Sequence, residues 1–166
     1  MKKILFSLIA VALLGCTNQP PKPLTDAEKE TIKNEVKKDF NIMLEAFKKH
    51  DLETALRYYL DFPDFMGIGP DGVIVDFAQF KKANEDMVNS AKSMQFTTIK
   101  EDSKILGSDQ VLYIYQYSAE IILNSGEKIT YDELAMTCLY KKVEGLWKIV
   151  FYHESGLPPV MTKLTE

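Results

Sequence analysis

One stretch near the end of the chain decides the fold: Glu144-Gly145-Leu146-Trp147-Lys148-Ile149-Val150-Phe151-Tyr152-His153-Glu154-Ser155-Gly156. Glu144-Gly145 is a turn signal, because glycine accepts backbone angles that other residues avoid. The residues that follow are rich in aromatic and β-branched side chains, which suit an extended strand. The stretch therefore predicts the last hairpin of an antiparallel sheet.

Working upstream from this hairpin, apolar and polar residues alternate from about Met94 onward. Turn signals at 107–109, 124–127 and 144–145 divide the region into four runs, which predicts four long antiparallel strands. In the run 111–123 both faces are partly apolar, so we expect both to be covered for part of their length. The helices would cover one face, and a second subunit could cover the other.

The first part of the chain has a helical period instead. A capping box at Thr25 precedes apolar residues at steps of three and four, which predicts a helix over roughly 25–50. Asp51 caps a second short helix that Pro63 ends, and Asp76 caps a third. Between these two helices, Gly69-Pro70-Asp71-Gly72 predicts a small hairpin and lacks the spacing of a phosphate-binding loop.

The element order α-α-β-β-α-β-β-β-β predicts an α+β fold. We expect three N-terminal helices packed on one face of a curved, mainly antiparallel sheet. The domain boundaries follow from these elements as 25–158, with a tail at 159–166.

Residues 1–15 have the composition of an export signal, with Lys2 and Lys3 before an apolar run too short to span a bilayer. Leu13-Leu14-Gly15-Cys16 resembles the lipobox of bacterial lipoproteins, which implies cleavage before a lipidated Cys16. A plain signal peptide with an incidental cysteine is the alternative. Residues 16–24 would then be the lipidated cysteine and a proline-rich tether. The resemblance implies a lipid anchor in the bacterial envelope, on the periplasmic side of the outer membrane if the cell is Gram-negative.

Charge excludes one class of partner. The whole chain has a formal net charge of −4, and without Lys2 and Lys3 it has 18 basic and 24 acidic residues, a net charge of −6. Nucleic-acid binding needs a clustered basic surface, so we expect none. Four acidic residues of the second-helix and hairpin region form either a solvated rim or a field that repels anions: Asp61, Asp64, Asp71 and Asp76.

The quoted hairpin resembles the last hairpin of the nuclear transport factor 2-like (SnoaL-like) superfamily, which has a cone-shaped, cystatin-like fold. The run W-x-x-V-x-x-H-x-S-G-x-P, from Trp147 to Pro158, is especially similar to the association domain of calcium/calmodulin-dependent protein kinase II. The run F-x-x-x-D-L-E-x-x-L, from Phe47 to Leu56, is similar to the first-helix signature of the superfamily. These residues specify a fold better than a function.

The resemblance implies a pocket between the concave sheet and the helices, and dimerisation through the sheet. Steroid isomerases of this superfamily need a tyrosine and an aspartate base, whose expected positions hold Met43 and Gly67 or Ile68, so isomerase chemistry of that type is not expected. We expect a small apolar ligand instead, and place the predicted pocket residues at Tyr113, Tyr115, Tyr117, Trp147 and His153. Core or interface packing is the alternative for the tyrosines.

His153 with Glu133 or Asp132 is the candidate acid–base pair, since a histidine beside a carboxylate can move protons near neutral pH. The alternative for His153 is a hydrogen-bonded residue at a strand end. Two histidines about a hundred residues apart give no metal-ligand spacing, so no metal or other cofactor is expected. Cys138 is expected to be a buried thiol, and a catalytic thiol is the alternative.

Three functions follow from these expectations. The first is a non-catalytic module that binds a small molecule or a peptide as a homodimer. The second is a SnoaL-like enzyme of the cyclase, dehydratase or isomerase type that uses His153. The third is a structural role in the envelope, which predicts no pocket.

Overall fold

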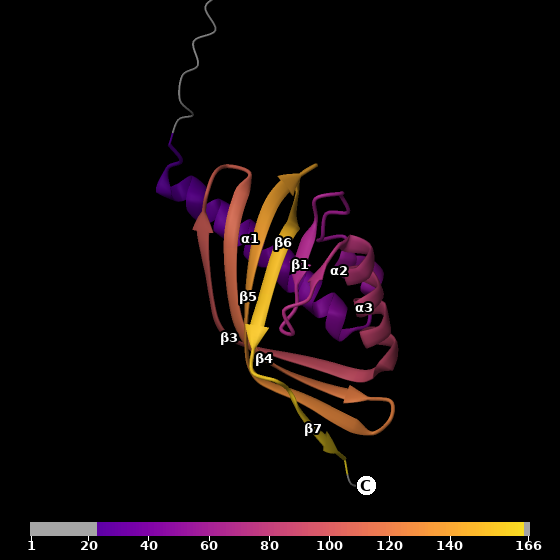
Figure 1. Cartoon of the computed structure of the whole chain (residues 1–166). Helices are drawn as coiled ribbons and strands as arrows, with labels where there is room; N and C mark the ends of the chain where they lie inside the picture. Colours follow the sequence, from indigo (N-terminus) through magenta and orange to yellow (C-terminus); the bar gives the residue numbers. More distant parts are fainter. Residues whose placement is uncertain (1–22, 165–166) are drawn as a thin grey trace, which may run out of the picture.

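The computed structural model describes residues 23–164, in which three helices lie against one curved sheet of seven strands (Figure 1). In chain order the elements are α1 (Asp26–Lys48), α2 (Leu52–Leu56), β1 (Met66–Ile68), β2 (Ile74–Val75), α3 (Phe77–Ser90), β3 (Ala91–Ile105), β4 (Gln110–Leu123), β5 (Glu127–Val143), β6 (Leu146–Gly156) and β7 (Val160–Lys163). The order predicted from the sequence is confirmed as far as β6. The predicted tail at 159–166 needs a correction, because β7 pairs with β5 through Thr130↔Val160.

The predicted caps form as hydrogen bonds. Thr25 accepts from the backbone N–H of Glu28, and Oε2 of Glu28 accepts from the N–H of Thr25 at 2.7 Å. Asp76 caps α3 in the same way, together with Gln79. Helix α3 ends at Ser90 and β3 starts without a loop, so the strand begins earlier than the alternation from Met94 predicted.

The sheet has the strand order β2-β1-β6-β5-β4-β3. Strand β1 runs parallel to β6, and the other paired strands are antiparallel. Figure 1 shows α1 crossing one face of this sheet, while the lower ends of β3, β4 and β5 turn and pass below α3. The helices and the curved strands therefore enclose a space between them.

Strand irregularities on both sides of Tyr117 accompany this curvature. On one side, the register with β3 shifts between Thr98 and Lys100. On the other, Tyr117 and Ala119 pair with Leu134 and Tyr131, so β5 has one extra residue. A third bulge lies in β6, because Tyr140 pairs with Ile149 while its neighbour Leu139 pairs with Phe151. An extra residue bends its strand and reverses which side chains face inward beyond it.

The core lies where α1 packs on β4, β5 and β6. Val36 and Phe40 of α1 are fully or almost fully buried, as are Trp147 and Ile149 of β6. Burial of side chains this large removes much apolar area from water and is the main stabilising contribution here, at about 25 cal/mol per Å².

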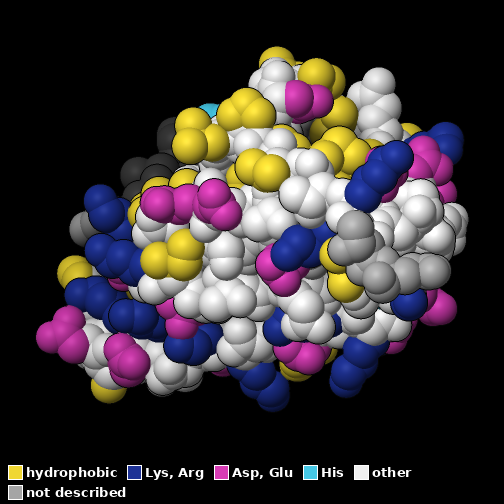
Figure 2. Space-filling view, turned by 90° about the horizontal axis from the view of Figure 1, so that it is seen from below, with side chains coloured by type: hydrophobic (Ala, Val, Ile, Leu, Met, Phe, Trp, Pro, Cys, Tyr) yellow, Lys and Arg dark blue, Asp and Glu magenta, His cyan; other side chains and the backbone are white. Residues whose placement is uncertain are grey.

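The surface is mixed in character. Figure 2 shows the molecule from below, with apolar side chains gathered in one region and basic side chains interspersed with acidic ones elsewhere. Within residues 23–164, no helix combines the length and the apolar composition that crossing a bilayer requires.

Candidate functional site

A cavity of about 500 Å³ lies between the concave face of the sheet and the helices. Helix α1 contributes Phe40 and Phe47, α3 contributes Phe80 and Met87, and the hairpin of β1 and β2 adds Val75. The strands contribute Met94, Phe96, Tyr115, Tyr117, Ala119, Tyr131, Met136, Tyr152 and Glu154. Small-molecule sites in proteins are mostly apolar cavities of about 300–1,000 Å³ with few polar groups, and this cavity fits that description.

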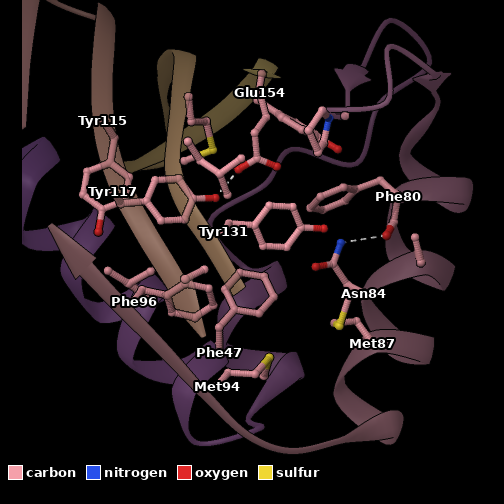
Figure 3. Close-up of a pocket in the computed structure, with 18 of the residues that line it drawn as sticks. Phe47, Phe80, Asn84, Met87, Met94, Phe96, Tyr115, Tyr117, Tyr131 and Glu154 are labelled. Carbon is pink, nitrogen blue, oxygen red and sulfur yellow. Dashed lines mark hydrogen bonds between the residues drawn. The ribbon is translucent and has the colours of Figure 1, made fainter. Parts of the chain in front are cut away.

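Aromatic rings make up much of the wall, and they contact one another (Figure 3). Tyr115 and Tyr117 stack with ring centroids 4.8 Å apart, and Phe96 meets Tyr117 edge to face at 6.1 Å. On the helical side, the ring of Phe80 lies 4.4 Å from that of Tyr59 and 5.3 Å from that of Tyr152. Such packing holds the rings in place, so the shape of the cavity is largely preformed.

Glu154 is the carboxyl group that enters the cavity from β6. Figure 3 shows it pointing toward Tyr117 and Tyr131. The Tyr117 hydroxyl donates a hydrogen bond to Oε1 of Glu154. Burial raises the pKa of the Glu154 carboxyl, and the hydrogen bond from Tyr117 opposes that rise. Burial, followed by the nearby Glu154 charge, raises the pKa of Tyr117, so this hydroxyl stays protonated and acts as a donor.

Two other polar groups of the wall have hydrogen-bond partners within the protein. Nδ2 of Asn84 donates to the backbone carbonyl of Phe80 at 2.8 Å. The hydroxyls of Tyr115 and Thr98 are 3.1 Å apart. Burial raises the pKa of Tyr131, and the charges of Glu154 and Asp71 add to that rise. The wall therefore presents hydroxyls and carboxyls inside an apolar surface.

Two of the predicted pocket residues, Tyr115 and Tyr117, line the cavity. Two others are buried elsewhere and correct that prediction. The Tyr113 hydroxyl donates to Glu101. Trp147 is only 1% exposed, and its Nε1 donates to Glu35. Both belong to the core cluster that α1 forms with the sheet.

The predicted acid–base pair needs a second correction. His153, Glu133 and Asp132 are exposed, and they are absent from the cavity wall. Strict alternation from Trp147 would turn His153 inward, but the bulge at Val150 shifts the inward positions to Tyr152 and Glu154. The extra residue in β5 has the same effect on Glu133, which instead accepts a hydrogen bond from Gln116.

Glu154 and Tyr131 are among the wall residues that the sequence did not predict. A signal for Glu154 was present in Ile149-Val150-Phe151-Tyr152, where four consecutive apolar residues interrupt the alternation. Such a run is typical of a strand that is buried on both faces or that contains a bulge. For Tyr131 the polar pair Asp132-Glu133 is a comparable signal, because two consecutive polar residues also interrupt the alternation.

Cys138 is free and fully buried, and it faces Tyr152 across β5 and β6. Burial raises the pKa of its thiol, so it stays protonated and behaves as a small apolar side chain. Cys16 lies outside the described residues. Among residues 23–164, no group of three or more His, Cys, Asp or Glu side chains is placed to hold a metal ion.

This architecture, an α+β domain with a cavity between its helices and a curved sheet, is the nuclear transport factor 2-like fold. The family model of the SnoaL-like domain matches residues 36–161, and the chain belongs to this family. No curated protein sequence matches the chain.

Solved structures share the fold at low sequence identity. A candidate scytalone dehydratase of Novosphingobium aromaticivorans has a TM-score of 0.73 at 8% identity, over 86% of this chain and 93% of the other. A hexachlorocyclohexane dehydrochlorinase, LinA-type3 of Novosphingobium barchaimii, has a TM-score of 0.66 at 12% identity, over 86% and 99%. A nuclear transport factor 2-like protein of Salmonella enterica serovar Typhimurium has a TM-score of 0.68 at 16% identity, over 77% and 92%.

Proposed function

We propose that the mature protein is a lipid-anchored binding protein of the bacterial envelope, and that its cavity holds a small, mainly apolar molecule. The observation that carries this proposal is the aromatic cavity of about 500 Å³ with the Glu154 carboxyl directed into it. An apolar body would gain from the burial of its surface, and Glu154 would fix its orientation through one polar group.

The inward polar groups favour binding over reaction. The expected acid–base pair of His153 and Glu133 lies outside the cavity. The Tyr117 hydroxyl beside Glu154 has a raised pKa, so it donates a hydrogen bond rather than exchanging a proton near neutral pH. Glu154 is thus oriented by a group that remains protonated, as suits a fixed anchor for a ligand.

One observation favours a second candidate, an enzyme that eliminates a small leaving group from an apolar substrate. Burial raises the pKa of Glu154, and a carboxylate with a raised pKa is a stronger base in a water-poor site. Proteins of similar fold are named as a dehydrochlorinase and a candidate dehydratase. In this function Glu154 takes a proton from carbon, in place of His153.

The binding experiment uses the mature chain from residue 16 with Cys16→Ser, so that it is free of lipid. The neutral dye N-phenyl-1-naphthylamine is titrated, and fluorescence reports binding. Ala119 lines the cavity, so we expect Ala119→Trp to weaken binding at least tenfold. Ala78→Trp, at an exposed position of α3, is the matched control. If both variants bind the dye as the unsubstituted chain does, the cavity is not the binding site.

The enzyme candidate is tested by its product. Apolar β-hydroxy-ketones and β-chloro compounds are incubated with the protein, and nuclear magnetic resonance follows the alkene. Turnover that disappears in Glu154→Gln and persists in Glu133→Gln would favour the enzyme over the binding protein. Bound but unchanged compounds would favour the binding protein.

Lipid anchoring is supported by the lipobox-like residues that end at Cys16 and by the basic and apolar residues before them. Mass spectrometry of the protein from its host should give an N-terminal diacylated or triacylated Cys16. Cys16→Ser should release the protein from the membrane fraction. Recovery of unlipidated protein that begins after an ordinary signal-peptide cut would contradict the anchor.

A homodimer through the outer face of the sheet is the proposed assembly. This face carries Leu112, Ile114, Leu139 and Phe151, which are half-buried or exposed in one chain. Apolar side chains on a sheet face suit an isologous interface, in which the same patch meets itself. The similarity of the last hairpin to a kinase association domain also supports self-association.

A further inference from the structure

The cavity wall is acidic and has no basic counterpart. Glu154 points into the cavity and Asp71 lies at its edge, where it is exposed. Among the described residues that line the wall, none is a lysine, an arginine or a histidine. A ligand with a carboxylate or a phosphate would meet only like charge here, which costs free energy in a site of low dielectric.

Glu154 also has unused hydrogen-bonding capacity. Tyr117 donates to Oε1, whereas no described side chain donates a hydrogen bond to Oε2. A buried carboxylate is costly unless it is paired or fully hydrogen-bonded. An ammonium group is the partner that would compensate the charge and donate to Oε2 at the same time.

The rings around Glu154 suit a cation as well. Tyr117 and Tyr131 lie next to the carboxyl, with Phe80 and Phe96 further along the same cavity (Figure 3). The face of an aromatic ring carries partial negative charge, so it attracts ammonium groups and their polarised C–H bonds. The same rings bury an apolar body, so one wall serves both parts of an amphipathic cation.

The acidic surroundings of the cavity also favour a cationic ligand. Asp61, Asp64 and Asp76 are exposed on the segments that lead into and out of the hairpin holding Asp71. The chain without Lys2 and Lys3 has a net charge of −6, from 18 basic and 24 acidic residues. This field raises the local concentration of cations and lowers that of anions.

We propose that the cavity selects organic cations, namely amines with an aromatic or alkyl body, whose ammonium group binds Glu154. This proposal rests on the proposed binding function and names its ligand class. Glu154 is the residue that gives the selectivity, and the aromatic wall gives affinity for the body.

A matched set of probes isolates the charge. The mature chain with Cys16→Ser is titrated by calorimetry with 4-phenylbutylamine, 4-phenylbutan-1-ol and 4-phenylbutanoate at one pH and one salt concentration. The three probes share a hydrocarbon body and differ in the end group. We expect the amine to bind at least tenfold more tightly than the alcohol, and the carboxylate to bind most weakly.

Variants then assign the selectivity to one side chain. Glu154→Gln should reduce the affinity for the amine to that for the alcohol, and should leave the alcohol within about twofold. Glu133→Gln makes the same chemical change at an exposed position of β5 and should change no affinity. If Glu154→Gln does not fold, the comparison of the three probes on the protein with Glu154 intact still tests the selectivity for cations.

The outcomes separate the two proposals. Equal binding of amine and alcohol, or tighter binding of the carboxylate, overturns the selectivity for cations while the binding function stands. Failure of all three probes and of the neutral dye overturns the binding function and the selectivity with it. A preference for the amine that survives Glu154→Gln overturns the assignment to Glu154.

Discussion

Nε1 of Trp147 donates a hydrogen bond to Oε2 of Glu35 at 2.9 Å, and this bond joins the last hairpin to α1. The same oxygen accepts from Nζ of Lys142 at 2.6 Å, and the Lys142 ammonium lies 5.3 Å from the centroid of the Trp147 ring. The backbone N–H of Trp147 donates to Asp39 at 3.2 Å. One buried tryptophan therefore fixes the helix on the sheet, and with it the helical wall of the cavity.

Trp147→Phe should destabilise the domain by about 2 kcal/mol, because the change leaves a void and removes a hydrogen bond to a charged group. Urea unfolding followed by circular dichroism measures the loss. Tyr58→Phe, at a half-buried position near Asp39, is the comparison and should cost less than half as much. An unchanged unfolding midpoint for Trp147→Phe would show that this anchor is dispensable.

Tyr117→Phe should raise the pKa of Glu154 further, because the hydrogen bond from Tyr117 is the interaction that lowers it. The variant should also lose about 1–3 kcal/mol of stability at neutral pH, since a buried carboxyl loses its donor. A titration of the glutamate side-chain ¹³C signals measures the pKa. Tyr115→Phe, whose hydroxyl meets Thr98 instead, should leave the Glu154 titration in place.

Glu154 should make stability fall as the pH rises. Its pKa is higher in the folded state than in the unfolded chain, so between these values the unfolded chain releases a proton that the folded domain keeps. Below its pKa in the unfolded chain, Glu154 adds no pH dependence to the stability. Above its pKa in the folded state, its full destabilising effect is present. The stability of Glu154→Gln relative to the parent protein should therefore increase as the pH rises above about 4.5, the ordinary pKa of a glutamate side chain. Thermal unfolding at pH 4 and pH 8 measures this difference, and a constant difference would contradict the burial of the carboxyl.

Gly67→Ala should distort the cavity wall. A methyl group at Gly67 would collide with the ring of Tyr152, whose Cζ lies only 2.6 Å from the position of the added carbon. The ring must move, and overpacking of this kind costs about 1–3 kcal/mol. We expect weaker binding of the neutral dye together with lower stability. Gly107→Ala, where the nearest atom is 3.6 Å away, is the control and should affect neither property.

The proposed dimer should dissociate when its face receives charge. Ile114 is 38% exposed and lies on the outer face of β4. Ile114→Lys should convert a dimer to a monomer, because an isologous patch would place two copies of the charge close together. Analytical ultracentrifugation gives the mass, and Ile99→Lys tests whether the contact extends to β3. A monomer for the parent protein would contradict the proposed assembly.

The sequence predicts the elements of this fold well and the orientation of its strand residues less well. Turn and cap residues such as Thr25, Asp76 and Gly145 act locally, so their effects can be deduced without knowledge of the tertiary structure. The inward face of β4 is also predictable, because alternation is unbroken from Val111 to Ile121. Whether Glu133 faces inward depends on a bulge. A break in the alternation, such as Asp132-Glu133, indicates where a bulge lies, but the packing of the whole sheet decides which residues face inward on either side of it.

The position of the bulge at Val150 decides which chemical group the cavity contains. If the same residues paired with β5 without a bulge, strict alternation would turn the imidazole of His153 inward and the carboxyl of Glu154 outward. A bulge moved beyond Glu154 would thus exchange an acid for a base in an otherwise unchanged scaffold. Changes in the position of a bulge, as well as substitutions, are therefore a route by which domains of this architecture acquire different chemistries.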